Sequence, residues 1–373
     1  MRMRRSAVVL AGGAMAAALL GTAVPSEAAT APSSTAVYKL VLGPVNSQYV
    51  GINNRGDIIG IGVDSAAFGR EEGFIINAGT TTPVFLGAPG DETDQSTDTR
   101  PRAINDQGVV VGNYQKNEVL PGGVEATIPR PATWPDDGTG SDLGVNPTGD
   151  ADAFGINNNQ QIVGTQAGKT VTPWLLQGTT VTNLQTLSGS TITEARAINI
   201  NGVVVGDAQK SGSEVATEWV NAKVSTLGTL NGGTFSEALA INSSGQAVGA
   251  ATAPGDPINL FRAVMFSNGK VIDLNVPGEG QQNAAHATAI NGNGVIVGDD
   301  GIDPDLVDVG NGFIYQNGHA TELNTLIAPT PNVRLAGAAG INDAGDIVGI
   351  AVVTLSDGSE ISEGYELLPN TTP

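Results

Sequence analysis

Short alternations of apolar and polar residues recur along the chain, and they predict β-strands. In one clear case, Arg196 stands between small apolar residues in the stretch Ala195–Ile198, and a β-branched run follows at Val203–Val205. Alternation with a period of two and β-branched runs are both typical of strands. Because only a short stretch separates the two segments, they are predicted to form a β-hairpin.

The turn of this hairpin belongs to a phrase that the chain repeats seven times, Ile-Asn-x-x-Gly-x-x-x-Gly, with one exception at the first glycine. Asparagine at the first position of a type I turn bonds forward to the backbone, and the glycine three residues later suits the left-handed bulge that follows such a turn. The second glycine ends the strand or lets a neighbouring backbone come close. We therefore interpret the asparagines as turn residues rather than as a binding ring. They are Asn53, Asn105, Asn157, Asn199, Asn242, Asn291 and Asn342.

The third copy of the phrase is the exception, with Gln160 where the other six copies have the first glycine. If its turn matches the others, Gln160 adopts a left-handed backbone at a cost on the order of 1 kcal/mol. The alternative is a shifted turn in which Asn158 or Asn159 takes that conformation.

Each repeat contains two more strand-like segments, which makes four strands in a unit of 42–52 residues. The third segment centres on an aromatic or bulky apolar residue, as at Trp134, Trp174 and Trp219, and the last centres on a leucine, as at Leu86. Four short strands in such a unit are typical of a β-propeller blade. The sequence therefore predicts an all-β fold, a seven-bladed β-propeller with four strands per blade. For the three tryptophans it favours core positions between blades over ligand stacking.

The ends of the repeat array predict how the ring closes. The chain has seven hairpins and seven aromatic segments, but only six leucine segments follow them. Tyr38–Gly43, before the first hairpin, resembles the missing seventh leucine segment. We expect the N-terminal strand 38–43 to pair in the last blade, beside residues 363–368. This pairing would leave no long strand edge exposed.

Two repeated units carry a family resemblance: Ala-x-Ala-Ile-Asn-x-x-Gly-x-Val-Val-Gly and Leu-Gly-Thr-Leu-x-Gly-Gly. They are clearest at Thr226–Gly233 and Ala238–Asn242, and they resemble the HAF-type extracellular repeat family of bacterial secreted proteins. The resemblance covers essentially the whole mature chain. The His-Ala-Phe triplet that gives the family its name is absent, and Arg262–Val264 is the nearest version. The resemblance implies a secreted β-propeller-like repeat protein and assigns no catalytic residue.

The N-terminal segment has the pattern of a secretory signal peptide. Arginines at positions 2, 4 and 5 precede the apolar stretch Ala7–Val24, and Ser26 and Ala28 supply small residues before a cleavage point. The alternative, a membrane anchor, is weakened by glycines inside the stretch, and no later segment is long and apolar enough to cross a bilayer. We expect a secreted, extracellular protein with a signal peptide over 1–28, a short linker over 29–35, a single propeller over 36–369 and a tail over 370–373.

The 373-residue chain is strongly acidic, with a formal net charge of −20, and loss of residues 1–28 would make the charge more negative still. Nucleic acid and anionic membranes are poor partners for such a chain, because binding them requires a basic face. The chain has no cysteine, which excludes disulfides and thiolate metal sites. Aromatic residues make up only 4%, which is low for a protein that stacks on sugars. We expect a monomer.

Acidic residues gather most densely in the long loop of the sixth predicted blade. Calcium prefers several oxygen ligands at flexible spacing, and such a loop can supply them. The run does not match the EF-hand, because the required glycine and closing glutamate do not fall together. Calcium is therefore a candidate cofactor, and the alternative is a solvated acidic loop. The candidate metal ligands are Asp299, Asp300, Asp303, Asp305 and Asp308.

The chain has only two histidines, His286 and His319, in adjacent repeats. Their positions lack the spacing of a metal site, so both are interpreted as surface residues. No Gly-x-Ser-x-Gly elbow supports a Ser-His-Asp triad.

Two classes of function stay open at this point. Loops held on a rigid scaffold usually carry binding sites, so the longest inserts are expected to mark one. Three inserts follow the second glycine of a hairpin and should share one face: 114–131, 250–262 and 299–311. The fourth, 86–102, joins one blade to the next. We expect a non-catalytic binding scaffold for an extracellular protein, a polysaccharide or a surface ligand.

The alternative is a secreted enzyme that acts on polysaccharide, either a lyase or a glycosidase. Such an enzyme needs arginine, tyrosine, histidine or carboxylate groups gathered at one mouth of the channel. Arg196 and Arg262 are candidate members of such a group, but each is explained equally well as a strand-surface charge. With five tyrosines and two histidines in the chain, the binding class is favoured.

Overall fold

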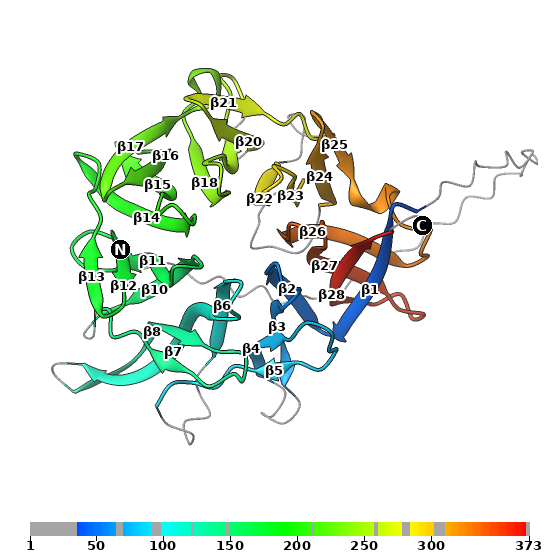
Figure 1. Cartoon of the computed structure of the whole chain (residues 1–373), viewed down its shortest axis with the longest axis horizontal. Coiled ribbons are helices and arrows are strands. Elements are labelled where there is room, and N and C mark those ends of the chain that lie inside the picture. Colours follow the sequence, from blue (N-terminus) through cyan, green and yellow to red (C-terminus); the bar gives the residue numbers. More distant parts are fainter. Residues whose placement is uncertain are drawn as a thin grey trace, which may run out of the picture. The chain divides into compact units, whose positions relative to one another are not determined.

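Seven four-stranded antiparallel sheets form a ring around a central axis (Figure 1). The structure is a computed structural model that describes residues 36–64, 70–90, 98–120, 123–146, 149–210, 212–256, 260–277, 284–301 and 310–370. Everything below concerns the unit Ala36–Pro373. The predicted all-β, seven-bladed propeller with four strands per blade is confirmed.

The first four blades are each built from strands that are consecutive in the sequence. The first holds β2 (Ser47–Ile52), β3 (Ile58–Asp64), β4 (Arg70–Ile76) and β5 (Val84–Phe85). The second holds β6 (Thr99–Ile104), β7 (Val110–Leu120), β8 (Val124–Trp134) and β9 (Ser141–Asp142). The third holds β10 (Ala151–Ile156), β11 (Gln161–Gln166), β12 (Thr172–Gln177) and β13 (Thr180–Asn183). The fourth holds β14 (Ser190–Ile198), β15 (Val204–Lys210), β16 (Ser213–Val220) and β17 (Lys223–Gly228).

The next two blades follow the same order, and the seventh borrows its outer strand from the start of the described chain. The fifth holds β18 (Ser236–Ile241), β19 (Ala247–Ala251), β20 (Arg262–Ser267) and β21 (Lys270–Asp273). The sixth holds β22 (His286–Ile290), β23 (Ile296–Asp299), β24 (Gly312–Gln316) and β25 (His319–Glu322). The seventh holds β26 (Val333–Ile341), β27 (Ile347–Thr354), β28 (Glu360–Pro369) and β1 (Tyr38–Val45).

The pairing of β1 with β28 closes the ring. The two strands are antiparallel, with Lys39 opposite Leu368 and Leu42 opposite Tyr365. The prediction that residues 38–43 lie beside residues 363–368 is therefore confirmed. Closure of this kind satisfies the backbone groups of a strand edge that would otherwise be free to pair with another chain.

The seven turn asparagines form a closed ring of hydrogen bonds between blades. The Nδ2 of each donates to the backbone carbonyl oxygen of the next asparagine, over 2.9 to 3.4 Å, and the last bond runs from Asn342 back to Asn53. The Oδ1 of each accepts from its own turn, as Asn199 does from the backbone N–H groups of Asn201 and Val203. The turn role is confirmed, and the bond to the next blade is a second role.

Gln160 takes the left-handed conformation that glycine takes in the other six turns. Its φ is 60°, against 76° to 89° for the glycines at the same place. Its backbone N–H bonds to the carbonyl oxygen of Asn157 at 3.0 Å, as in the other copies. The matching turn is therefore the right prediction, and the shifted turn at Asn158 or Asn159 is wrong.

The second glycine of the phrase lets the first and second strands of each blade come close. A Cβ placed on Gly206 would lie 2.0 Å from the carbonyl oxygen of Glu194, and one on Gly164 would lie 1.9 Å from that of Asp152. Next to this contact, the first strand of every blade has a bulge that leaves one residue unpaired. These bulge residues are Val50, Arg102, Phe154, Arg196, Leu239, Thr288 and Ala339.

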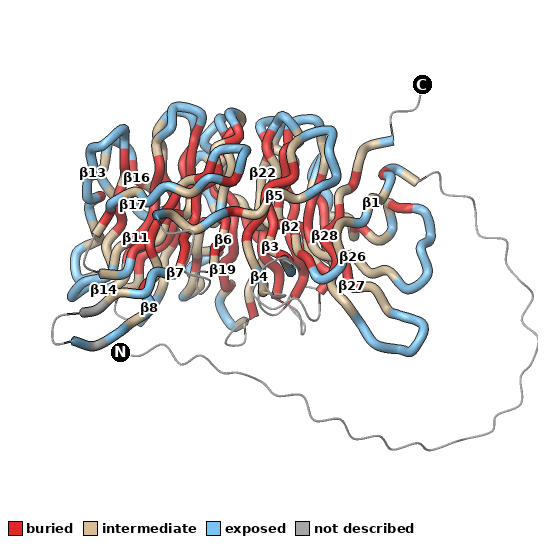
Figure 2. The backbone as a smooth tube through the Cα atoms, turned by 90° about the horizontal axis from the view of Figure 1, so that it is seen from below, coloured by how far each residue is buried: buried red, intermediate tan, exposed pale blue. Residues whose placement is uncertain are grey.

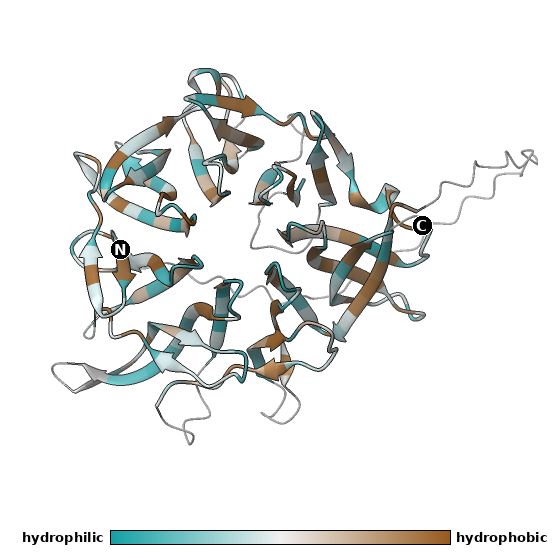
Figure 3. Cartoon of the chain, in the orientation of Figure 1, coloured by the Kyte–Doolittle hydropathy of each residue, from teal (hydrophilic) through white to brown (hydrophobic). Residues whose placement is uncertain are grey.

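The hydrophobic core lies between neighbouring blades. Ile59 and Leu86 of the first blade, for example, pack with Val110 and Trp134 of the second. Trp134, Trp174 and Trp219 are buried, so the prediction that they are core residues is confirmed. Apolar positions follow the strands, and buried residues fill the strands between two faces of exposed turns (Figures 2 and 3).

Replacing Asn199 by alanine should lower the free energy of unfolding by roughly 2–4 kcal/mol, because it removes one buried hydrogen bond to the next blade and two partly buried ones within its own turn. The matched control is Asn201→Ala, since Asn201 is exposed and only its Nδ2 bond to Ser243 is lost. That control should change stability by no more than about 0.5 kcal/mol. Urea unfolding followed by tryptophan fluorescence measures both, and equal losses would contradict the role of the ring.

Candidate ligand pocket between the fourth and fifth blades

The order of strands places the long inserts on one face of the ring. Connections in an antiparallel sheet alternate between its two ends. The asparagine turns therefore lie on one face, and the second-to-third strand loops lie on the other, together with the blade-to-blade connections. The inserts 114–131, 250–262 and 299–311 each join a second strand to a third, and the described strand ends that they connect lie on this face, as predicted. We call it the loop face; the connection 86–102 also lies on it.

A pocket of about 550 Å³ opens on the loop face at the junction of the fourth and fifth blades. Its walls are the start of β16, the segment 232–235 that leads into β18, and parts of the loop between β19 and β20. Phe235 and Phe261 lie side by side in the wall, with ring centroids 4.6 Å apart and planes inclined by 42°. Both rings are partly exposed, so they offer an apolar surface to a ligand.

Two carboxylates line this pocket, and they have different surroundings. Asp256 binds the guanidinium of Arg262 through both oxygens, at 2.9 and 3.0 Å, and also accepts from the backbone N–H of Ala253. Hydrogen bonding to Arg262 holds the pKa of Asp256 below its ordinary value. Glu214 instead faces other carboxylates.

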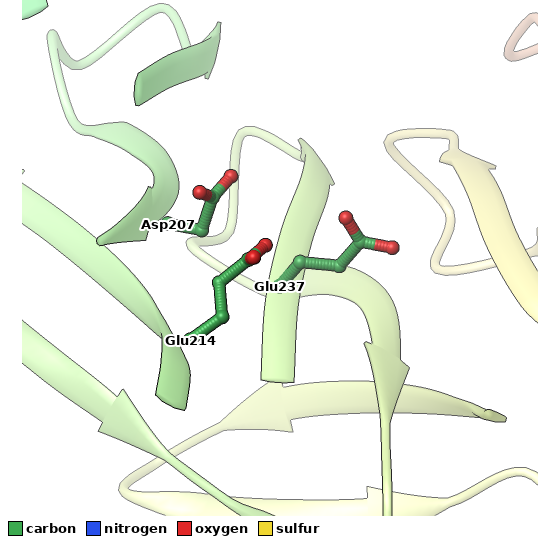
Figure 4. A group of neighbouring side chains, drawn as sticks. All are labelled: Asp207, Glu214 and Glu237. Atoms are coloured by element: carbon green, nitrogen blue, oxygen red, sulfur yellow. The ribbon is translucent and has the colours of Figure 1, made fainter. Parts of the chain in front are cut away.

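Glu214 forms a cluster with Asp207 and Glu237, carried by three strands of two blades (Figure 4). One carboxylate oxygen from each lies within 4.8 Å of the others. Asp207 is in β15, Glu214 in β16 and Glu237 in β18, so the cluster bridges the fourth and fifth blades. We call these three residues the carboxylate cluster. Oxygen atoms at this separation could hold one cation or share protons.

Arg196 partly compensates the charge of the cluster. Its Nε lies 3.3 Å from Oδ1 of Asp207, and its Nη2 pairs with Oε2 of Glu194 at 2.5 Å. One guanidinium therefore faces several acids. Arg196 and Arg262, expected as candidate members of a polar group at one mouth of the channel, both lie near this pocket: Arg262 pairs with Asp256 of its lining, and Arg196 pairs with Asp207 of the carboxylate cluster.

Burial raises the pKa values of two members of the cluster, Glu214 and Asp207. It raises the pKa of Glu214 to about 7, and the charge of Glu237 adds to the effect. It raises the pKa of Asp207 well above its ordinary value, although Arg196 acts in the opposite direction. At neutral pH the cluster is therefore partly protonated, and a bound cation would displace these protons.

A stack of bulge residues extends the polar wall towards the second blade. The guanidinium carbon of Arg102 lies 5.7 Å from the ring centroid of Phe154, and that of Arg196 lies 5.4 Å from the same centroid. Asp152 lies nearby; burial raises its pKa, while Asn113 donates a hydrogen bond to it and acts in the opposite direction. Three successive blades thus join their bulge residues by cation–π contacts.

The interpretation of both histidines as surface residues is wrong for His286. Its side chain is 1% exposed, because Phe261 of the preceding blade covers it at a ring distance of 5.4 Å. Its Nδ1 lies 3.6 Å from Asp299, and within the described residues that nitrogen has no hydrogen-bond partner. His319 is exposed, as expected.

The predicted calcium ligands are only partly within the described residues. Asp299 and Asp300 are both buried; Asp299 accepts from the backbone N–H of Gly301, and Asp300 accepts from that of Asn311. Burial raises the pKa of Asp300. Asp303, Asp305 and Asp308 lie outside the described residues, so the calcium site in this loop stays a prediction.

Sequence reasoning missed the residues of the pocket and the cluster. Asp207, Glu214 and Glu237 are isolated acids in the sequence, and Phe235 and Phe261 lie in loops rather than in the repeated aromatic strand. One signal was present: Asp207 directly follows the second glycine of its phrase, where only the sixth copy also has an acid, Asp299, and the first and fifth copies have Ile61 and Ala250.

Comparisons with known proteins leave the function to be inferred from this site. Neither a family model nor a curated protein matches the sequence, so the resemblance to HAF-type repeats also stays a prediction. One similar solved structure is that of a puromycin-hydrolyzing peptidase of Mycobacterium tuberculosis, at 14% identity and a TM-score of 0.41, covering 85% of this chain and 58% of the peptidase. Another is sucrose-6-phosphate hydrolase from Lactobacillus gasseri, at 10% identity and a TM-score of 0.31, covering 88% and 91%. In the described part of the chain, no helix has the length and apolar character of a membrane span.

The stability of the protein should depend on pH through Glu214. Below its unfolded-state pKa of 4.5, this group is protonated in both states; between 4.5 and about 7 only the folded state holds the proton. Stability therefore falls as pH rises through this window, by on the order of 1 kcal/mol from this partly exposed group. Glu214→Gln should flatten the fall in Tm between pH 5 and pH 7.5. Glu218→Gln, on the same strand but outside the cluster, should leave it unchanged; an unaltered slope in Glu214→Gln would show that the cluster is not the cause.

Proposed function

We propose that this chain is a secreted, extracellular β-propeller that binds a carbohydrate ligand without transforming it, in the pocket between the fourth and fifth blades. The observation that carries the proposal is the pair Phe235 and Phe261, partly exposed side by side in a pocket of about 550 Å³. Ligand sites are concave and mostly apolar, with a few placed polar groups. The low aromatic content of the chain does not argue against this site, because two of its eight phenylalanines are in the pocket.

The polar lining supports a ligand rich in hydroxyl groups. Ser213, Thr234 and Thr252 line the pocket, and hydroxyl side chains both donate and accept hydrogen bonds. Thr252 also orders the wall, because its Oγ1 accepts from the backbone N–H groups of Thr234 and Phe235, at 3.2 and 3.1 Å. The aromatic pair is therefore supported by hydrogen bonds from the neighbouring strand end.

The placement of the carboxylates supports binding over hydrolysis. Glycosidases hold two carboxyl groups roughly 5–5.5 Å apart when they retain the anomeric configuration and roughly 6.5–9.5 Å apart when they invert it. In the carboxylate cluster, oxygens from all three residues lie within 4.8 Å of one another. Of these three acids only Glu214 lines the pocket, and the other carboxylate of its described lining, Asp256, is held by Arg262, so this lining does not place two uncompensated carboxylates on either side of a sugar.

One observation favours the enzyme alternative. Glu214 lines the pocket and has a pKa raised to about 7 by burial, as a general acid requires near neutral pH. Incubation with a panel of soluble polysaccharides, followed by an assay for new reducing ends, separates the two functions. We expect no new reducing ends. Their release by the wild type but not by Glu214→Gln would establish that the protein is an enzyme instead.

Phe261→Leu should lower retention of the protein on its polysaccharide by at least about tenfold, because leucine keeps the apolar contact but lacks the flat ring surface. The measurement is affinity electrophoresis or pull-down on a panel of polysaccharides that includes chitin and chitosan. The matched control is Phe154→Leu, a partly exposed ring in the bulge stack outside the pocket. Equal retention of all three proteins, or no retention of the wild type across the panel, would contradict the proposal.

A further inference from the structure

We propose that the carbohydrate bound in this pocket carries a protonated amino group, and that Glu214 recognises this group. The inference rests on the proposed function and deepens it by naming the chemical class of ligand: an oligosaccharide of 2-amino sugars with free amines. Its basis is the placement of an unbalanced acidic group beside an aromatic pair.

Among the side chains that the structure describes, acids outnumber guanidinium groups on one side of the pocket. Asp256 is matched by Arg262 through two hydrogen bonds. On the side of Glu214, three acids of the described residues, Glu194, Asp207 and Glu214, lie around the guanidinium of Arg196. The negative charge of these acids stabilises a bound cationic group more than it stabilises a neutral one.

The aromatic pair makes a sugar amine a better match for this charge than a bare metal ion. Phe261 is supported from behind by His286, at a ring distance of 5.4 Å, so its position is fixed by the core of the next blade. A partly exposed ring offers an apolar face to the C–H groups of a sugar, and the negative face of its π-system also attracts a nearby ammonium group. A metal ion would use only the carboxylates, and it would leave the rings and most of the pocket unused.

The size of the site agrees with this class of ligand. A pocket of about 550 Å³ lies in the range of small-molecule sites, roughly 300–1,000 Å³. The cavity has room for more than a single ion, and Glu214 belongs both to its wall and to the carboxylate cluster. One sugar unit can therefore lie against the phenylalanines while its amine reaches the cluster.

Isothermal titration calorimetry tests the inference with two probes that differ only at the amine: the tetramer of β-1,4-linked glucosamine and its fully N-acetylated form. Measurements are made at 0.15 M NaCl. We expect the wild type to bind the free-amine tetramer at least tenfold more tightly than the acetylated one. Glu214→Gln should reduce this preference to less than threefold, and Glu218→Gln should keep it.

The variant comparison separates pocket recognition from general attraction. The chain has 37 acidic residues, so a polycation bound by overall charge would lose almost nothing when one carboxylate is removed. A preference retained in Glu214→Gln would therefore overturn the inference. Loss of the binding heat of both tetramers in 1 mM CaCl₂ would also overturn it, because the carboxylate cluster would then act as a metal site.

The outcomes also distinguish this inference from the function on which it rests. If both tetramers bind equally and Phe261→Leu loses this binding, recognition of the amine is rejected and carbohydrate binding in the pocket is supported. Binding of neither tetramer by the wild type would reject the inference; the polysaccharide panel then decides the proposed function by itself.

Discussion

The ring of asparagine amides is the constraint on which the rest of the structure depends. Each side chain closes its own turn through Oδ1 and reaches the next turn through Nδ2. These bonds are buried, so a blade that moved out of register would leave several polar groups without partners. The distance between neighbouring turns is thereby fixed around the ring. Beside each turn, the second glycine of the phrase allows the first two strands of the blade to come close. The blades can differ elsewhere because these two features hold them in place.

Variation is concentrated at positions that the phrase does not constrain. The residue after the second glycine lies opposite a residue of the first strand, and this pair of positions changes from blade to blade. Three blades show the change. The paired residues are Asn113 and Arg100 in the second blade, Asp207 and Glu194 in the fourth, and Asp299 and His286 in the sixth. The equivalent position in the fifth blade supplies Glu237, opposite Ala250. Asp207 and Glu237 of the carboxylate cluster and the His286–Asp299 contact therefore come from one variable register position on a constant frame, whereas Glu214 is supplied by β16.

Most of the fold could be predicted from the sequence, because turn chemistry and strand period are local and were repeated seven times. The count of leucine segments even placed β1 beside β28. The burial of His286 could not be predicted, since it depends on Phe261 of the preceding blade. Nor do equal residue types imply equal contacts: Trp219 lies opposite Val204 and donates to the carbonyl oxygen of Gln185, whereas Trp174 lies opposite Gly164 and its Nε1 has no partner among the described residues.

The candidate site was beyond sequence reasoning for the same physical reason. Asp207 and Glu237 become neighbours only when two blades pack at a fixed register, and Phe235 and Phe261 meet only because a connection and a loop end at the same junction. The aspartates in the acidic loop of the sixth blade are adjacent in the sequence, and such adjacency is a weaker indication of a site than convergence in space. Repeat proteins make this contrast clear, since their frame is local and their sites are not.

A crystal structure of the protein grown with the glucosamine tetramer tests the central claim most directly. The account predicts a sugar ring against Phe235 and Phe261 with its amine within hydrogen-bond distance of Glu214, while all seven asparagine bonds stay as they are. A tetramer held against Arg102 and Phe154, or on the opposite face over the asparagine turns, would contradict it.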